Sequence, residues 1–303
     1  MSHNHNHHHN HSSEVSTTRL LITMTLNFII TIAELIGGIL SGSLALISDA
    51  LHNFSDGIAI IISYIAIRLN KKPVSENFTF GFKRAEIIAA VFNASVLIGI
   101  SIYLFIESYK RFVNPEPIEG SLMIIVASIG LIANVIGTLL LQKGAKDNMN
   151  IKSAYLHLMS DAVSSVGVII GGIFIYFYNV YWIDPILTVL ISIYIIKESY
   201  LIVKEATFVL MMAAPNNLSL SEIEKEILTI KEIHNIHHVH IWRVNDKEVH
   251  FEAHAQVEDI MVSSTDSILE QAQHLLSTKF NIHHLTLQFE CNKCDDVGLI
   301  NNH

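Results

Sequence analysis

The first two-thirds of the chain consist of long apolar stretches separated by short polar segments. A helix needs about 20 apolar residues to span the hydrocarbon core of a bilayer. Six stretches approach this length, at roughly residues 20–40, 44–68, 86–109, 121–141, 152–177 and 182–203. The pattern therefore predicts six transmembrane helices over residues 19–205. Further apolar stretches follow the first one directly, and no small-residue cleavage site lies between them. We therefore do not expect the first stretch to be a cleavable signal peptide.

From residue 206 onward the pattern changes to that of a small α+β domain. Ser219 or Ser221, followed by EIEKEI, begins an amphipathic helix. The segments HHVHIWRV and EVHFEAHAQV alternate apolar and polar residues, as strands do, around an Asn245-Asp246 turn. A helical STDSILEQAQHLLSTKF segment and an alternating HHLTLQFE segment follow. The order αββαβ over residues 206–303 predicts a three-stranded sheet.

The composition supports the membrane assignment and argues against nucleic-acid binding. Of the 303 residues, 50% are apolar and 16% are charged, against about 25% charged in ordinary soluble domains. The mean hydropathy is +0.42. Residues 1–204 hold 13 basic and 13 acidic residues, whereas residues 205–303 hold 6 and 15, so the net charge of -9 comes from the C-terminal part. There is no basic face that could bind nucleic acid.

The distribution of Lys and Arg predicts the orientation in the membrane, because short basic loops stay in the cytoplasm. With a cytoplasmic N-terminus, 11 basic residues of the first 204 fall at cytoplasmic ends and only Lys110 and Arg111 on the other side. An even number of spans then brings the C-terminal domain to the cytoplasm too. We expect an integral protein of the cell membrane with both termini in the cytoplasm.

Histidines are concentrated at the two ends of the chain. Six of the 18 lie in residues 1–11 and ten in residues 234–303. Residues 1–18 are a low-complexity segment rich in His and Asn, which we expect to be disordered. They are either a purification tag or a natural metal-collecting tail. Cys291 and Cys294 form one C-x-x-C pair, which is half of a zinc site or a pair of cytosolic thiols.

The two remaining histidines lie inside predicted membrane spans, each four residues before an aspartate. They are His52 with Asp56, and His157 with Asp161. Residues four apart lie on the same face of a helix, so each pair directs two ligands toward one point. An Asp at the bilayer centre costs about 2.5–3.5 kcal/mol. The two pairs should therefore face each other and form an N2O2 site for a divalent metal ion, Zn²⁺ above all.

Other polar residues in the spans have weaker indications. Each His-Asp pair could instead be a buried hydrogen bond between helices, but two identical pairs favour a metal site. Asp49 shares a face with Asp56 and is either a residue that supports the ligands or lines the ion pathway, or an acid at the end of its span. Glu34 and Asn134 are expected to form hydrogen bonds between helices.

The C-terminal domain offers a second group of metal ligands. Sheet alternation places His250, Glu252, His254 and Gln256 on the face opposite Phe251, with Thr286, Gln288 and Glu290 on the matching face of the last strand. By the same alternation His237 and His283 would lie on the core side. These histidines are either metal ligands or solvated residues of an exposed sheet face.

Several motifs together resemble the cation diffusion facilitator family, in its zinc-transporter branch. They are GSLALISDALHNFSD, FTFGFKRAEIIAA, SAYLHLMSDAVSSVGV, WIDP and the segment from VHIW to AHAQV, and the similarity covers residues 19–290 in order. The resemblance implies six spans, a cytoplasmic metallochaperone-like αββαβ domain, a homodimer in the bilayer, and export of divalent metal in exchange for protons.

The resemblance also assigns site residues. His52, Asp56, His157 and Asp161 match the transport site, and His237, His254, His283 and Glu290 match positions that bind regulatory zinc. The loop NKKPVSENFTF between the second and third spans contains no His or Asp, which speaks against the extra membrane-surface site of some members. The His-rich insertion between spans four and five is missing as well.

We therefore hypothesise a zinc/proton antiporter that works by alternating access, with Co²⁺, Cd²⁺ and Mn²⁺ as further ions that the ligands could accept. Zinc would be both substrate and regulatory ligand, and no enzyme activity is expected. One alternative is an intramembrane metalloprotease, but Asn53 and Leu158 stand where an HExxH motif has its glutamate. The other is a membrane-anchored metal sensor, which leaves the six spans unexplained.

Overall fold

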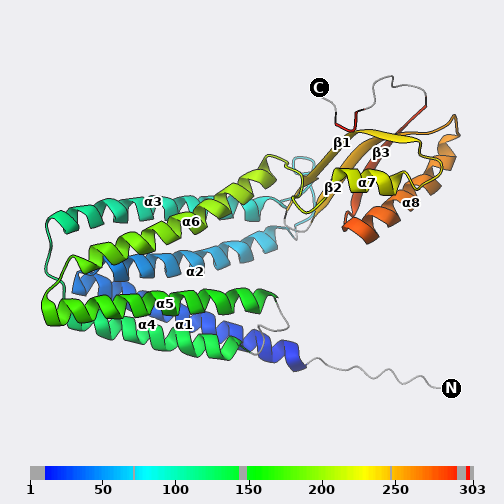
Figure 1. Ribbon diagram of the computed structural model, residues 1–303. Coiled ribbons are helices and arrows are strands. Elements are labelled where there is room, and N and C mark those ends of the chain that lie inside the picture. The colour runs from blue at the N-terminus through cyan, green and yellow to red at the C-terminus, as the bar shows by residue number, and fades with distance from the viewer. Residues whose placement is uncertain (1–10, 71, 143–148, 246–247, 292–297, 301–303) are drawn as a thin grey trace, which may run out of the picture. The chain divides into compact units, whose positions relative to one another are not determined.

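The computed structural model describes residues 11–70, 72–142, 149–245, 248–291 and 298–300, and these form a helical part followed by a small α/β part (Figure 1). The helical part contains α1 (His11–Ser41), α2 (Leu44–Asn70), α3 (Ala85–Val113), α4 (Gly120–Leu141), α5 (Met149–Tyr178) and α6 (Ile183–Leu210). The second part contains α7 (Leu220–Ile227), β1 (Asn235–Arg243), β2 (Val249–Gln256), α8 (Val262–Phe280) and β3 (His284–Glu290).

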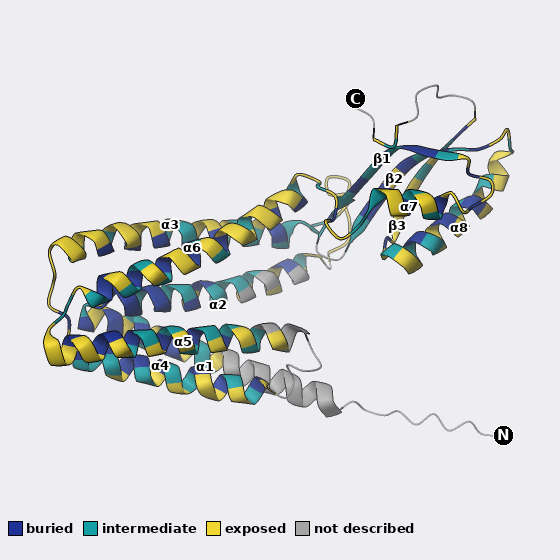
Figure 2. Ribbon diagram, in the orientation of Figure 1, coloured by how far each residue is buried: buried dark blue, intermediate teal, exposed yellow. Residues whose placement is uncertain are grey.

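Among the described residues, five helices, α2 to α6, are long and apolar enough to cross a membrane, and α1 contributes a shorter apolar stretch at Thr25–Ser41. The six predicted spans are thus all helical, and the helical membrane domain is confirmed. Large apolar side chains such as Ile102 and Phe105 of α3 are exposed in the chain alone, as the yellow positions along α3 in Figure 2 illustrate. A lipid environment accounts for this exposure.

The first helix begins earlier than the sequence pattern suggests. It starts at His11, so residues 11–18, which we assigned to the N-terminal tail, are helical. No Gly or Pro interrupts residues 11–19, and the helix of the first span can therefore continue backward through them. Residues 1–10, with five of the six N-terminal histidines, lie outside the described part of the chain.

The chain divides into two compact units, residues 1–61 with 92–201 and residues 62–91 with 202–303. In the first unit, small residues allow α4 to lie against α1 and α5. A Cβ atom on Gly120 would lie 2.8 Å from the backbone nitrogen of Tyr176, and one on Gly130 would lie 2.3 Å from Oε1 of Glu34. Glycines at helix crossings are typical of packing in membranes, where close backbone approach supplies the attraction.

A buried carboxylate joins the start of α2 to α6. Asp184 is 0% exposed and accepts hydrogen bonds from the Ser43 hydroxyl at 2.5 Å and from the backbone N–H groups of Leu44 and Ala45 at 2.8 and 3.2 Å. It satisfies N–H groups that a helix start leaves without intrahelical partners, and its charge suits the positive end of the helix. The position of α2, which carries two predicted ligands, is thereby fixed relative to α6.

The second unit contains a three-stranded sheet in the order β1-β2-β3. β1 runs antiparallel to β2, and β2 runs parallel to β3 after the α8 crossover. The turn between β1 and β2 is held by the Asn245 side chain, which accepts a hydrogen bond from the backbone N–H of Glu248 at 2.9 Å. The predicted αββαβ order is confirmed.

The hydrophobic core of this domain lies on one face of the sheet. Phe251, Ala253 and Ala255 of β2 are each fully buried and pack in one cluster with residues of α7 and α8. In α8 the buried residues Ile268, Ala272 and Leu276 recur every four positions, which forms an apolar stripe along one side of the helix. Alternation along β2 leaves the histidines of that strand on the opposite face.

One extra residue in β1 changes the alternation of that strand. His237 pairs with His254 and His240 with Glu252, so three steps along β1 match two along β2. His238 adopts φ 53°, a left-handed conformation uncommon for residues other than glycine. This β-bulge moves His237 to the same face as His254. Strict alternation, which places His237 on the core side, is wrong at this point.

We predict that Phe251→Ala lowers the free energy of unfolding of the C-terminal domain by about 3–5 kcal/mol, because it leaves a cavity in the core. Urea unfolding of the full chain in detergent, followed by Trp242 fluorescence in a Trp182→Phe background, measures this change. The control is Thr286→Ala on the exposed face, which should cost less than about 1 kcal/mol. Equal midpoints for the two variants would contradict the assigned core.

Candidate metal centres

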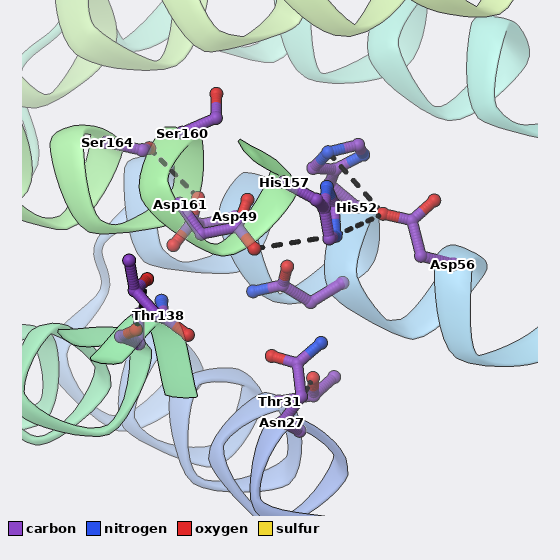
Figure 3. A network of polar contacts seen from close by, with 12 residues as sticks. Asn27, Thr31, Asp49, His52, Asp56, Thr138, His157, Ser160, Asp161 and Ser164 are labelled. Carbon is purple, nitrogen blue, oxygen red and sulfur yellow. Dashed lines mark hydrogen bonds and ion pairs between the residues drawn. The ribbon is translucent and has the colours of Figure 1, made fainter. Parts of the chain in front are cut away.

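The two His-Asp pairs of the membrane domain meet between α2 and α5. Nε2 of His157 lies 3.3 Å from Oδ2 of Asp56 on the other helix and 3.4 Å from Oδ2 of Asp161 on its own. Nε2 of His52 lies 3.6 Å from the same Asp56 oxygen. Figure 3 shows the four side chains pointing toward one another, with dashed lines between His157 and both carboxylates. The sequence-predicted ligands are therefore brought together.

The spacing of these atoms suits a shared metal ion. Zinc ligands at about 2.0–2.1 Å in a tetrahedron lie about 3.3 Å from each other, close to the distances just given. Ligand atoms of His52, His157 and Asp161 all lie within 4.8 Å of one another, and Asp56 contacts both histidines. Hydrogen bonds to carboxylates would be shorter, at about 2.7–2.9 Å. The arrangement is that of ligands around a common point.

Burial leaves several of these atoms without another partner. Oδ2 of Asp56, Oδ2 of Asp161 and Nε2 of His157 are buried and make no hydrogen bond within the described part of the chain. A buried polar atom without a partner costs about 1–3 kcal/mol, and more when it is charged. A divalent cation among them would satisfy two carboxylate oxygens and the imidazole at once.

Asp49 lies beside the ligands but is held by a different contact. Its Oδ1 accepts a hydrogen bond from the Ser164 hydroxyl at 2.9 Å, which links α2 to α5. Asp49 is 3% exposed, and Figure 3 places it next to Asp161. Asp49 therefore joins α2 to α5 beside the candidate ligands.

The other polar residues noted in the spans differ from each other. Glu34 accepts a hydrogen bond from the Asn53 amide at 3.2 Å, as expected of a contact between helices. Asn134 is buried, yet neither of its side-chain polar atoms finds a hydrogen-bond partner among the described residues. The expected hydrogen bond of Asn134 is therefore not found.

A cavity of about 370 Å³ lies next to the site and involves residues that the sequence did not indicate. Tyr194 of α6 lines it, 3.3 Å from the Ser160 hydroxyl and with its ring 6.5 Å from that of His52. Ser164 follows His157 by seven residues on the same helix face, so periodicity could have identified it. Tyr194 could not have been found, because nothing in its local sequence marks it.

A second cluster joins all three strands of the C-terminal sheet. Oε2 of Glu290 lies 3.4 Å from Nε2 of His237, and Oε1 lies 3.1 Å from Nδ1 of His254. Gln288 also donates a hydrogen bond to Oε1 of Glu290 at 2.7 Å. Both ring nitrogens of His237 are buried without a hydrogen bond. Three of the four residues proposed for regulatory zinc therefore form one potential metal site.

The fourth residue, His283, is not part of this cluster. It lies just before β3, is exposed, and its Nε2 is 3.0 Å from Oδ1 of Asn281. Alternation does not apply to it, since it lies outside the strand, and it lines a different cavity together with His250 and His284. Cys291 is a free, exposed thiol, and Cys294 lies outside the described residues.

Comparison with known proteins identifies both parts of the chain. Residues 20–211 match the cation efflux transmembrane domain. Residues 215–291 match the cytoplasmic domain of cation efflux proteins. The chain belongs to the cation efflux family. It is thus an integral membrane protein of a transporter family, not an enzyme, and its C-terminal domain is cytoplasmic.

Several curated relatives have closely similar sequences over most of their length. The metal cation efflux system protein CzcD of Cupriavidus metallidurans is 38% identical over 91% of this chain and 87% of its own. The cadmium, cobalt and zinc/H(+)-K(+) antiporter of Bacillus subtilis is 38% identical over 86% of this chain and 84% of its own. The zinc transporter ZitB of Escherichia coli is 36% identical, with coverages of 87% and 84%.

In this cation efflux protein, the packing of α4 against α1 should support the metal site. A side chain in Gly130→Leu would collide with Glu34, which accepts a hydrogen bond from Asn53, the neighbour of the candidate ligand His52. We predict a loss of about 1–3 kcal/mol of stability, measured as a lower melting temperature in detergent, together with reduced metal flux in vesicles. The control is Gly99→Leu, because a Cβ there meets nothing within 4 Å. Equal melting temperatures for the two variants would contradict this packing role.

Proposed function

We propose that this chain exports divalent metal ions, Zn²⁺ above all, in exchange for protons. The transport site consists of His52, Asp56, His157 and Asp161. The observation that carries the proposal is the convergence of two imidazoles and two carboxylates from two apolar helices, with contacts of 3.3–3.6 Å between them. Ionisable side chains at this depth are costly and mark ion pathways. The names of the relatives, which include zinc, cobalt and cadmium, point to the same ions.

The ligand chemistry explains the choice of ion. Imidazole suits zinc and similar transition metals, whereas magnesium and calcium require oxygen ligands. Zinc accepts mixed nitrogen and oxygen ligands in a tetrahedron without a geometric preference of its own. Cobalt, cadmium and manganese are further ions that such a set can hold. Zinc in this site is substrate, and no resident cofactor is required.

Coupling to protons follows from the charge of the site. With one Zn²⁺, two carboxylates and two neutral imidazoles have no net charge. Without the ion, two adjacent negative charges would remain in a medium of low dielectric constant, which favours proton binding. Metal and protons therefore compete for the same atoms. If the site opens alternately to each side, this competition produces exchange, with zinc leaving the cytoplasm as protons enter.

The surroundings of the site fit this cycle. The cavity beside His52 is lined by polar groups of α2 and α5 and by apolar residues of α6 such as Leu187 and Leu190. It offers a hydrated ion a space of about 370 Å³, larger than the roughly 30 Å³ that one water occupies in the liquid. We assign the protein to the cell membrane with both termini in the cytoplasm, because basic residues dominate that side.

The cytoplasmic domain is proposed to regulate transport as part of a homodimer. His237, His254 and Glu290 would bind zinc when its cytosolic concentration is high. His237 is nearly completely buried. An ion bound there would give its ring nitrogens the partner that they lack among the described residues. Metal binding would then stabilise one arrangement of the sheet and strengthen dimerisation.

Two other functions are less consistent with the site. An intramembrane metalloprotease needs a catalytic glutamate beside its ligands and an open coordination position. Asn53 occupies that position after His52, and its amide donates to Glu34. A metal sensor without transport would use the cytoplasmic cluster but would not need ligands in the membrane. Metal flux separates a carrier from a sensor.

For transport, we predict that His157→Ala reduces pH-gradient-driven zinc flux at least about tenfold, because even residues that only support metal ligands contribute that much. Its Nε2 is the atom that contacts both carboxylates. Zinc uptake into sealed vesicles with an imposed pH gradient is the measurement. The control is His274→Ala, the same change at an exposed histidine of α8. Unchanged zinc flux in His157→Ala would refute the transport site. Zinc flux that does not depend on the pH gradient would refute the exchange for protons.

For regulation, we predict that zinc lowers the dissociation constant of the dimer about tenfold and that His237→Gln removes this effect, since ligand binding to one state shifts the equilibrium toward it. Sedimentation of the full chain in detergent, with and without zinc, measures the dimer. His157→Ala serves as background, so that the transport site does not contribute. The control is His234→Gln, whose histidine is exposed and paired with Glu258. A dissociation constant of the dimer that zinc does not change would contradict the regulatory role.

A further inference from the structure

A second pair of histidines faces one another at the start of β2 and β3. The parallel register places His250 opposite His284, and their rings stack with centroids 3.9 Å apart and planes 23° apart. His250 is four residues from His254, which corresponds to about 13 Å along a strand. The pair therefore cannot share an ion with the cluster formed by His237, His254 and Glu290.

Aromatic residues enclose this pair. Trp242 is the partner of His250 on β1, with ring centroids 5.4 Å apart, and Phe80 approaches His250 to 5.6 Å. A cavity of about 400 Å³ is lined by these histidines, by Phe80 and by His283. The walls limit access of water to His250, while His284 and His283 remain exposed and leave a path from solvent.

The chemistry of His250 indicates a ligand that accepts its lone pair. The residue is 3% exposed, and its Nδ1 is buried without a hydrogen bond from any described residue. Buried polar atoms in folded proteins nearly always have a partner. Burial, with smaller contributions from His284 and Lys83, lowers the pKa of His250. A metal ion would give the buried Nδ1 atom of His250 the partner that it lacks among the described residues.

The charge around the pair does not prevent cation binding. Lys83 also lines the cavity, but it forms an ion pair with Glu248, so the two charges offset each other. Two zinc-bound nitrogens lie about 3.3 Å apart, and the ring centroids of His250 and His284, 3.9 Å apart, show that the two imidazoles are close neighbours. The lone pairs of stacked imidazoles lie in the ring planes and point side by side, so binding of one ion requires the two rings to turn out of the stack about their side-chain bonds.

We propose that His250 and His284 bind a divalent transition-metal ion such as Zn²⁺, with water completing the shell. This would be a third metal site, separate from the transport site and from the cluster at Glu290. The proposal does not depend on transport.

Zinc titration of the full chain in detergent tests this proposal. Equilibrium dialysis should find about one bound zinc fewer per chain in His284→Gln than in the unchanged protein, as expected for loss of one ligand from an incomplete set. The matched control is His274→Gln, an exposed histidine on α8, which should leave the stoichiometry unchanged. The same stoichiometry in both variants would overturn the proposal, as would an equal loss in both.

A second measurement needs no substitution and so does not depend on how a variant folds. Diethyl pyrocarbonate modifies accessible imidazoles, and peptide mass spectrometry identifies the modified residues. Zinc should protect His284 from modification at least about tenfold, in line with the effect of metal ligation on imidazole availability, while His274 in the same sample should react equally with and without zinc. Modification of His284 that is unchanged by zinc would overturn the proposal.

Discussion

The intolerance of the lipid interior for unpaired charge determines how this protein is built. Asp56 and Asp161 can exist among apolar helices only if their carboxylates face partners inside the bundle. That requirement turns α2 and α5 toward each other and explains why the ligand atoms meet at 3.3–3.6 Å. The same requirement explains the glycines of α4, which let neighbouring helices approach closely enough to exclude lipid.

Much of the membrane domain could be predicted from sequence because its physical signals are local. Apolar length identifies a span, and the spacing of His52 and Asp56 identifies a helix face, without knowledge of any distant residue. Contacts between helices have no such local signal. Asp184 caps α2 across 140 residues of chain, and Tyr194 reaches the cavity from α6. No local pattern marks either role, since each depends on how separate helices pack.

In the cytoplasmic domain, too, local features could be predicted from the sequence, whereas contacts between distant residues could not. Alternation of residues in β2 correctly separated Phe251, Ala253 and Ala255 from the histidines, because a regular strand has a strict period of two. The bulge in β1 has no such signature. Only the pairing of strands reveals that His237 lies beside His254, and only the position of the β3 start separates His283 from Glu290. The resemblance to relatives identified His237 where alternation did not.

The bulge at His238 decides which histidine of β1 lies opposite His254. In a regular ladder of the same residues, His238 would take that place and His237 would turn toward the core face, away from Glu290. Most substitutions on the solvent side of β1 would leave that geometry intact. The place of His237 beside Glu290 and His254 therefore depends on the backbone conformation of a single neighbouring residue as well as on the ligand side chains themselves.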